Sequence, residues 1–453
     1  MPNNEIEVVS KVNAHPTKAF FVRMLTRDIT LDDCILDLVD NSVDGAWKVS
    51  GKNPSEFRVN NDLAHFRIDI EFSDKGFRIA DNCGGITLDD AADYAFTFGR
   101  RSAQPKSDFT VGVYGIGMKR AAFKIGNQIS VRSTYRDDKT LVGFQVPVNV
   151  TNWMKNESDD WDFDLEEYPA ASDPGVEIEI IELSSETKLR FADPSYSMGL
   201  TRVLGRDYLV PMMRGLRIFV NEVEVKTLPL ELLLDTQFVP LRSAYSDGVV
   251  RVELFAGMRS RPPDTNDPDE SRRRYDDNSG WYIICNGRVV LESDRTAITG
   301  WGILGTPSWH PQYTGFVGIA FFSSKESASL PMTTTKRSVD TSSGVYRRAL
   351  AKMQVPTRAW VSYTNGRKND ASVRALEASA KPREVSTLAI NRIVKLPQPK
   401  SVGERLANVA YAVPLNKLRS LAAVFGQRQM SQKEVGMKSF DYAYKDLVNE
   451  EEA

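Results

Sequence analysis

The sequence predicts an α+β protein with two α/β domains followed by a helical C-terminal region. At roughly 150 residues per domain, its 453 residues are enough for about two to four domains. Helical and strand patterns alternate over residues 1–195, strand patterns recur at regular intervals over residues 196–350, and amphipathic helical patterns follow within residues 351–453. These three stretches are the predicted domains.

The elements of the first domain follow from hydrophobic period and capping. Thr30 can cap a helix, with Asp33 three positions on as a shortened capping box, and the helix should end near Gly51. FRIDIEF, residues 66–72, alternates apolar and polar side chains as a strand does. Further strands are expected at 76–80, 128–134, 141–146 and 176–181, and further helices at 88–96 and 118–124.

The second domain is read from four strand-like segments, LRIFVNEVEV, VVRVELFAG, GWYIICNGRVVLES and YTGFVGIAFF, and from a closing helix over residues 343–361. A surface loop is expected at 259–280. Residues 351–420 carry thirteen Lys or Arg against four Asp or Glu, which predicts a basic linker that either contacts nucleic acid or stays solvated. Amphipathic helices are expected at 415–425 and 440–447.

Composition narrows the class of protein. Apolar residues make up 41% and charged residues 26%, which is typical of a soluble globular chain, and the net charge of −2 identifies no partner. The three cysteines and three histidines are too scattered for a zinc site. Apolar runs fall short of the ~20 residues that a membrane span needs, so no membrane is expected. The sparse cysteines and the absence of a signal-type start predict a cytoplasmic protein.

The first of three chemical motifs is DLVDNSVDGA, which begins at Asp37. On a helix, Asp37 and Asn41 are one turn apart and project from the same face. Near a triphosphate, Asn41 can give Mg²⁺ the oxygen ligand that a hard cation prefers, and a carboxylate one turn away can orient or deprotonate a water. Alone the pair is weak evidence, because surface helices often carry Asp and Asn.

The second motif is DNCGGI, residues 81–86, directly after an expected strand. Asp81 can accept a hydrogen bond from an exocyclic amine such as that of adenine, and glycines let a flat base approach the backbone. The candidates are therefore Asp81, Gly85 and Ile86. An ordinary Asp-Asn-Gly turn is an equal alternative for this motif by itself.

The third motif is GVYGIGMK, which leads into a helix. Its glycines let successive N–H groups and the helix N-terminus face phosphate oxygens, and the lysine adds positive charge. It lacks the GK[ST] ending of a P-loop and the glycine spacing of a dinucleotide fingerprint. The candidates for phosphate contact are Gly112, Tyr114, Gly115, Ile116, Gly117, Met118 and Lys119.

In this order and within about 80 residues, the three motifs resemble those of the GHKL superfamily of ATPases, whose ATP-binding domain is the Bergerat α/β sandwich. The resemblance implies that Asp37 is the catalytic acid or base and that Asn41 binds Mg²⁺. It also implies that Asp81 and Gly85 bind adenine, and that Gly112, Gly115 and Gly117 wrap the phosphates after a flexible lid. ATP and Mg²⁺ are the expected cofactors.

The second domain extends the resemblance to about residues 15–350. It is similar to the transducer domain of the branch that includes MORC ATPases, MutL clamps, type II topoisomerases and ninety-kilodalton heat-shock chaperones. LPMTTTKR, residues 330–337, resembles the loop that sends a Lys or Arg to the γ-phosphate. Lys336 is the first candidate for that catalytic contact and Arg337 the second, with a basic surface turn as the alternative.

Two departures from the family pattern affect the expected chemistry. Asp37 stands where relatives have Glu, and displacements of about 1 Å can cost on the order of 100-fold in rate, so hydrolysis is expected to be slow unless the helix sits closer. Val176 occupies the place of a threonine that helps to hold adenine, which removes a polar contact worth about 1 kcal/mol. Nucleotide affinity is therefore expected to be modest.

The resemblance implies a Mg²⁺-dependent ATPase that forms a homodimer on binding nucleotide and acts as a molecular clamp. DNA is one possible substrate of the clamp, within a larger complex of partner subunits, and client proteins are the other. A nucleotide-gated scaffold or chaperone-like protein that hardly hydrolyses ATP is the main alternative. A protein kinase is disfavoured, because His15 precedes Asn41 too closely for the helical hairpin that presents a phosphoacceptor histidine.

Overall fold

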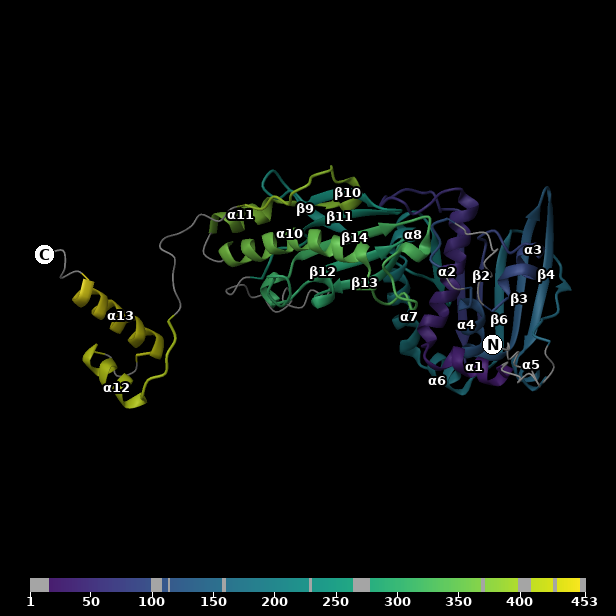
Figure 1. The fold of residues 1–453 in the computed structure, drawn as a ribbon, viewed down its shortest axis with the longest axis horizontal. Helices are drawn as coiled ribbons and strands as arrows, with labels where there is room; N and C mark the ends of the chain where they lie inside the picture. Colours follow the sequence, from purple (N-terminus) through teal and green to yellow (C-terminus); the bar gives the residue numbers. More distant parts are fainter. Residues whose placement is uncertain are drawn as a thin grey trace, which may run out of the picture. The chain divides into compact units, whose positions relative to one another are not determined.

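The computed structural model describes residues 16–98, 108–112, 115–156, 160–227, 230–263, 278–367, 371–397, 409–426 and 430–448. The chain divides into two compact units, Met1–Lys400 and Ser401–Ala453. The described part of the larger unit contains an eight-stranded, a five-stranded and a two-stranded sheet with their helices, and that of the smaller unit contains a pair of helices (Figure 1). We call residues 16–227 the first sheet region and residues 230–397 the second sheet region. Among the described residues, no helix has the length and apolar character to cross a membrane.

The first sheet region contains an eight-stranded sheet in the order β5-β4-β3-β6-β2-β1-β7-β8. Neighbouring strands are antiparallel except for β1 and β7, which are parallel. The strands are β1 (Arg67–Ser73), β2 (Gly76–Asp81), β3 (Gly126–Asp137), β4 (Thr140–Asn149), β5 (Glu166–Glu167), β6 (Gly175–Leu183), β7 (Arg217–Val220) and β8 (Val223–Glu224).

Helices α2 and α4 lie against one face of this sheet and share its hydrophobic core (Figure 1). As predicted, the Thr30 side chain caps α2 by accepting the N–H of Asp33, and Gly51 ends the helix in the left-handed conformation. The helices are α1 (Lys18–Arg27), α2 (Leu31–Ser50), α3 (Leu88–Asp90) with the π-helix Ala91–Ala95, α4 (Gly117–Ile125), α5 (Val150–Lys155), α6 (Ser185–Phe191), α7 (Pro194–Asp207) and α8 (Leu209–Met213).

The first sheet extends beyond residue 195, where the sequence placed a domain boundary. The segment LRIFVNEVEV, assigned to the second domain, forms β7 and β8 and pairs with β1. The register runs from Arg67 opposite Arg217 to Ile70 opposite Val220. This pairing was not predicted, because α6 and α7 carry the chain across the sheet, and a parallel neighbour of this kind leaves no local signal in the sequence.

The second sheet region is built on a five-stranded sheet in the order β10-β11-β14-β12-β13. All eight residues of its central strand β14 are buried, because the sheet is covered on both faces. The strands are β10 (Leu241–Asp247), β11 (Val250–Met258), β12 (Gly280–Cys285), β13 (Arg288–Asp294) and β14 (Phe316–Ser323). Short 3₁₀ turns occur at Ala297–Thr299, Pro311–Tyr313, Ser327–Ser329 and Val385–Thr387.

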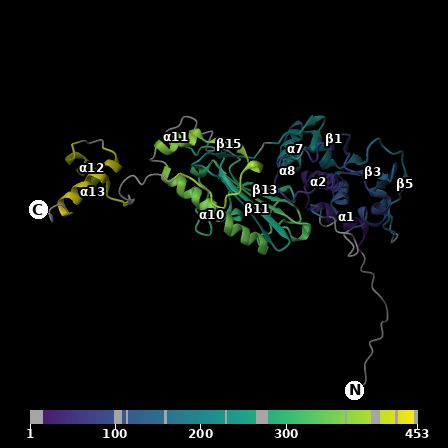
Figure 2. The same ribbon diagram turned by 90° about the horizontal axis from the view of Figure 1, so that it is seen from above.

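Helix α10 (Gly344–Gly366) runs along this five-stranded sheet and supplies part of its core (Figure 2). Its bounds are close to those of the predicted helix 343–361, and it extends into residues 351–453, which were predicted to be a basic linker and a helical region. After it come α11 (Ala371–Ser379) and β15 (Lys381–Glu384), which pairs with β9 (Glu231–Leu234). Much of the basic segment is therefore packed structure, because Val385 and Leu388 supply buried apolar side chains between its charges.

The smaller unit contains α12 (Leu415–Val424) and α13 (Gln432–Val448). Both helices were predicted, although α13 begins earlier than the expected residue 440. Ala422 and Val435 are the buried apolar residues among its described positions.

Candidate active site

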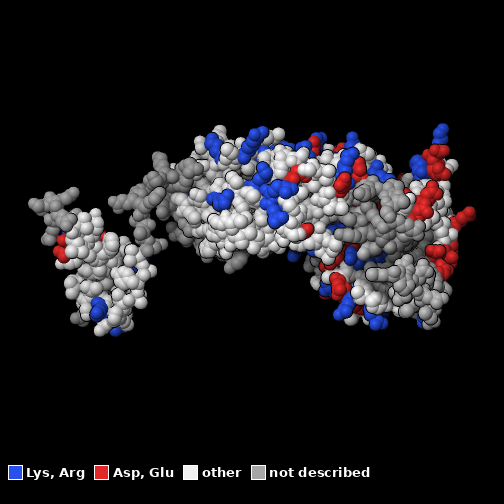
Figure 3. Space-filling view, in the orientation of Figure 1, with Lys and Arg blue, Asp and Glu red and all other residues white. Residues whose placement is uncertain are grey.

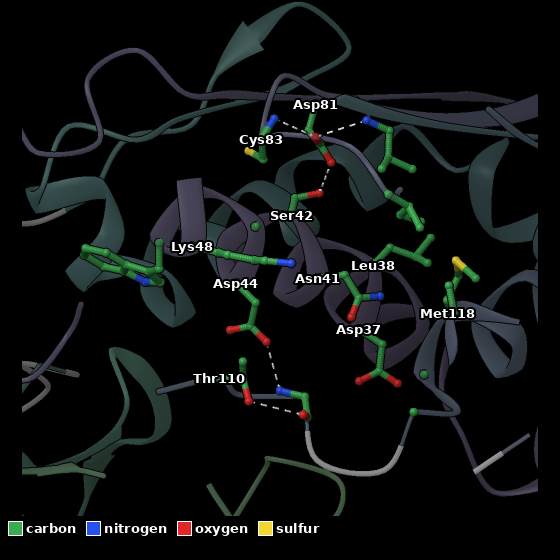
Figure 4. Close-up of a pocket in the computed structure, with 18 of the residues that line it drawn as sticks. Asp37, Leu38, Asn41, Ser42, Asp44, Lys48, Asp81, Cys83, Thr110 and Met118 are labelled. Atoms are coloured by element: carbon green, nitrogen blue, oxygen red, sulfur yellow. Dashed lines mark hydrogen bonds between the residues drawn. The ribbon is translucent and has the colours of Figure 1, made fainter. Parts of the chain in front are cut away.

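A cavity of about 1060 Å³ opens between α2, the turn after β2 and the N-terminus of α4 (Figure 4). Its size suits a small-molecule ligand. Several segments of the first sheet region meet there, and Lys325, Thr334 and Lys336 join them from the second sheet region. The predicted site residues that line it are Asp37, Asn41, Asp81, Gly85, Ile86, Gly112, Gly115, Ile116, Gly117, Met118, Lys119 and Lys336. Tyr114, also predicted, lies outside the described residues.

Helix α2 presents Asp37 and Asn41 to the cavity on successive turns, as their spacing predicts. Asp37 is only 7% exposed, whereas Asn41 is exposed to the cavity. Gly117 begins α4 beside Asp37, and a Cβ at this position would lie 3.3 Å from the Asp37 carboxyl carbon. The close approach of the two helices at the carboxylate therefore favours glycine at 117.

Asp81 is fixed at the end of β2 by three donors. Its carboxylate accepts the hydroxyl of Ser42 at 2.5 Å, the N–H of Cys83 at 2.8 Å and the N–H of Val176 at 3.3 Å (Figure 4). Burial nevertheless raises the pKa of Asp81 above its usual value. A preoriented acceptor at one end of the cavity suits an amine donor of a ligand, as the sequence predicted for this carboxylate.

The turn after Asp81 approaches β3 closely. Gly85 has φ +75°, and a Cβ there would lie 2.0 Å from the carbonyl oxygen of Thr134, so a larger residue does not fit. The Ser133 hydroxyl accepts the N–H of Ile86 and donates to its carbonyl. Ser133 was not predicted, because only the pairing of distant strands brings it to the turn.

Asp44 contacts the start of the glycine-rich segment, residues 112–117, which leads into α4. Its carboxylate accepts the N–H of Val111 at 3.0 Å and the N–H of Gly112 at 3.1 Å (Figure 4). Burial raises the pKa of Asp44 to about 7. Sequence reasoning missed this residue, although its position one turn after Asn41 on the same helix was a usable signal.

Lys119 contacts backbone carbonyls in the structure, and the phosphate contact predicted for it stays a prediction. Its ammonium donates to the carbonyls of Ala95 at 2.8 Å, Thr97 at 2.6 Å and Gly115 at 2.5 Å. Burial lowers the pKa of Lys119 to about 8. The side chain therefore ties the segment after the π-helix to the glycine-rich segment, because the rotation of α4 directs its ammonium to these carbonyls.

Lys336 reaches α2 from the second sheet region. Its ammonium lies 3.0 Å from Asp37 Oδ1 and 2.6 Å from Asp40 Oδ2, and its backbone has φ +56°. Burial by itself would lower the pKa of Lys336, but the charges of Asp40 and Asp37 outweigh it and raise the pKa. Left-handed backbone in a lysine is uncommon and clusters at functional sites.

The second oxygen of Asp37 is also bound to a cation, because Arg120 of α4 donates to Oδ2. Both oxygens of the predicted catalytic carboxylate are thus paired, one to each sheet region of the protein. Arg120 was not predicted. Its position one residue after Lys119 places it on the face of α4 toward α2, which the glycine motif alone does not reveal.

A buried network continues from Asp40 into the second sheet region. Arg288 donates to Asp40 at 3.1 Å and contacts Asp207 at 2.8 Å, and Tyr208 donates to Asp40 at 2.8 Å. Arg337, the second sequence candidate, pairs with Asp33 and Asp207 and has no pair with Asp37 among the described contacts. The geometry therefore separates the two cations of the loop and places Lys336 at the cavity.

The cavity has carboxylate and amide oxygens that a metal ion could use, from residues such as Asp37 and Asn41. No group of three or more His, Cys, Asp or Glu residues among the described positions is arranged to hold a metal ion. Mg²⁺ at nucleotide sites takes most of its ligands from phosphates and water, with one or two from protein. The exposed Asn41 amide in the cavity fits that donor set.

Comparison with known proteins finds a match over the part of the chain that forms most of this cavity. Residues 29–167 match the family model described as histidine kinase-, DNA gyrase B-, and HSP90-like ATPase. The match covers α2, the turn after β2 and the glycine-rich segment, and it supports ATP binding. The fold agrees with an ATP-binding α/β sandwich joined to a further α/β region and C-terminal helices. No curated protein matches the chain.

Proposed function

We propose that the protein is a Mg²⁺-dependent ATPase whose second sheet region acts as a transducer, in the manner of the MORC and MutL branch. One observation carries the proposal: Lys336, from a strand-to-helix segment of the second sheet region, lies in the cavity bonded to Asp37. The Lys336 ammonium is therefore placed to move from Asp37 to the γ-phosphate when ATP binds.

The proposed reaction uses groups already in the cavity. Asp81 binds the adenine amine, the N–H groups near Gly115 and Gly117 face the phosphates, and Asn41 would supply a ligand to Mg²⁺. Bound Mg²⁺ would neutralise negative charge on the phosphates. Transfer of Lys336 from Asp37 to the γ-phosphate leaves Asp37 free to accept a proton from the attacking water.

The proposal includes slow turnover. Asp37 is shorter than the glutamate of relatives, and both of its oxygens are paired with cations in the structure. A nucleotide-gated scaffold with little hydrolysis is the second candidate, and this double pairing is the observation that favours it. Both candidates include ATP-dependent homodimerisation, which the resemblance to the MORC and MutL branch implies.

Phosphate release distinguishes the two candidates. The wild-type protein should release phosphate from ATP in the presence of Mg²⁺, and Asp37→Asn should bind ATP but lower the rate by about 100-fold or more. ATP binding by both proteins with no phosphate release by either would favour the scaffold.

DNA is the proposed substrate of the clamp. Lys and Arg side chains gather over the second sheet region (Figure 3), and exposed basic residues there include Arg347, Lys352, Arg358, Lys381, Arg383, Arg392 and Lys395. Binding to duplex DNA should be measured over a salt series, with and without a non-hydrolysable ATP analogue. A steep salt dependence that appears only with nucleotide supports the DNA clamp, and no binding favours a protein client.

A kinase remains the less favoured alternative. The phosphoacceptor candidate, His15, lies outside the described residues.

A further inference from the structure

Residues 108–112, just before the glycine-rich motif, are held from two sides. On one side Asp44 of α2 accepts the N–H groups of Val111 and Gly112. On the other side the segment contacts the second sheet region, which is far away in sequence. The start of the glycine-rich segment therefore depends on both sheet regions.

Thr110 makes the principal contact with the second sheet region. Its carbonyl oxygen accepts the Ser327 hydroxyl at 2.5 Å and the Asn286 side-chain amide at 3.2 Å. Its own hydroxyl lies 3.0 Å from the Ser327 hydroxyl. The backbone N–H of Phe109 also donates to the carbonyl of Lys325 at 3.3 Å.

The groups that hold Thr110 belong to a well-packed part of the second sheet region. Asn286 is buried in the turn between β12 and β13, where its amide donates to the Ser324 carbonyl and its oxygen accepts the Ser324 N–H. Ser327 is buried as well. These groups contact Thr110, whereas the ammonium of Lys336 contacts Asp37 and Asp40 of α2.

We propose that Ser327 and Asn286 are positioning residues that hold Thr110, so that the segment beginning at Gly112 is preformed for phosphate. The inference rests on the proposed nucleotide function. It assigns the second sheet region two separable tasks: Ser327 and Asn286 support phosphate binding, while Lys336 supports turnover. Loss of the Thr110 contact should therefore change affinity, whereas loss of Lys336 should change rate.

The test compares Ser327→Ala with Ser327→Thr. Threonine keeps the hydroxyl, and a small cavity of about 40 Å³ beside Ser327 offers space for its methyl group. Binding of ATP, ADP and adenosine is measured by calorimetry, and kcat is measured at saturating ATP. Ser327→Ala should raise the Kd of ATP and ADP about five- to tenfold, the effect of one lost buried hydrogen bond. Adenosine binding, kcat and Ser327→Thr should stay near wild type.

Thr110→Val provides a second variant, because it removes the hydroxyl and keeps the backbone carbonyl. The double variant with Thr110→Val and Ser327→Ala should raise the Kd of ATP by a smaller factor than the product of the factors for the two single variants, because the two hydroxyls share one contact. Unchanged ATP affinity in folded Ser327→Ala, or an equal loss of adenosine affinity, overturns the inference. Failure of the wild-type protein to bind ATP would instead contradict the proposed function.

Discussion

Lys336 Nζ lies 3.0 Å from Asp37 Oδ1, so the cation expected at the γ-phosphate is bonded to the carboxylate expected to activate water. The two residues are 299 positions apart in sequence and belong to different sheet regions. This ion pair is one of the contacts that link the cavity to the second sheet region. Nucleotide can act on this pair only by binding one arrangement of it more tightly than the other.

Lys336→Ala should keep ATP binding but lower phosphate release by about 100-fold or more, the scale of losing one transition-state cation or donor. ATP-dependent dimerisation, measured by analytical ultracentrifugation, should also weaken. The matched control is Arg337→Ala, since the neighbouring side chain pairs with Asp33 and Asp207. Intact ATP-driven dimerisation in Lys336→Ala would count against the assignment.

Asp37→Glu tests whether the shorter carboxylate limits the rate. If it does, the longer side chain should raise phosphate release without tightening ATP binding, because it brings the carboxylate closer to a water placed for glutamate. A fall in activity would show that the native aspartate is correctly placed and that the argument for slow hydrolysis is wrong.

Asp40→Asn should destabilise the protein by about 3–5 kcal/mol, because it leaves Lys336 and Arg288 with one fewer buried counter-charge. Burial opposes ionisation of Asp40, but Lys336 and Arg288 outweigh it and lower the pKa. Urea denaturation measures the loss. Asp247→Asn, which breaks the more exposed pair with Arg348, is the control and should cost about 1 kcal/mol or less. Equal losses in the two variants would contradict a buried network.

The raised pKa of Asp44 predicts a pH dependence of stability. Burial raises this pKa to about 7, against about 3.9 in an unfolded chain. Between these values the folded protein keeps a proton that the unfolded chain has released. The contribution of Asp44 to the free energy of unfolding therefore falls as pH rises from about 4 to about 7, and it is constant above that range.

Asp44→Asn removes this titration. The stability of the wild-type protein relative to Asp44→Asn should therefore decline between pH 5 and pH 7 in urea denaturation. Two other charged groups, Asp40 and Lys336, act on Asp44. The pKa of Asp40 is lowered and the pKa of Lys336 is raised, so both lie outside the range from pH 5 to pH 7. Parallel pH profiles for the two proteins would show that Asp44 does not titrate there.

Lys119→Ala distinguishes a loop contact from a phosphate contact. Losing a buried ammonium that serves three carbonyls should lower the free energy of unfolding by on the order of 3 kcal/mol without nucleotide. Lys124→Ala on the same helix, which breaks a pair with the exposed Glu186, should cost about 1 kcal/mol or less. If Lys119→Ala leaves the free energy of unfolding unchanged but weakens ATP binding, the result would support a contact between Lys119 and phosphate.

The local parts of this site were predictable because their signals are local. Helix α2 follows from its Thr30 cap and apolar period, and Asp37 and Asn41 from helical spacing. Asp44 and Ser42 were missed as site residues because their partners arrive from elsewhere in the chain: Val111 is 67 residues from Asp44, and Asp81 is 39 residues from Ser42. Such pairings depend on tertiary packing, which hydrophobic periodicity does not report.

The buried charges were the least predictable feature. Arg288 sits in a strand-like run of apolar residues, and nothing nearby in the sequence indicates that Asp40 and Asp207 will surround it. The carbonyl contacts of Lys119 were also not predicted, because its place after a glycine motif indicated phosphate and the sequence does not report the rotation of α4. The place of Lys336 came from family resemblance, since spacing alone cannot connect two sheet regions.

Calorimetric titration with Mg·ATP tests the central claim most directly, that α2, the turn at Asp81 and the glycine-rich segment form one nucleotide site. The wild-type protein should bind one ATP per chain, and Asp81→Asn, whose neighbours Cys83 and Val176 keep the turn in place, should bind at least tenfold more weakly. No heat of binding with the wild-type protein, or equal affinity in folded Asp81→Asn, would contradict the account.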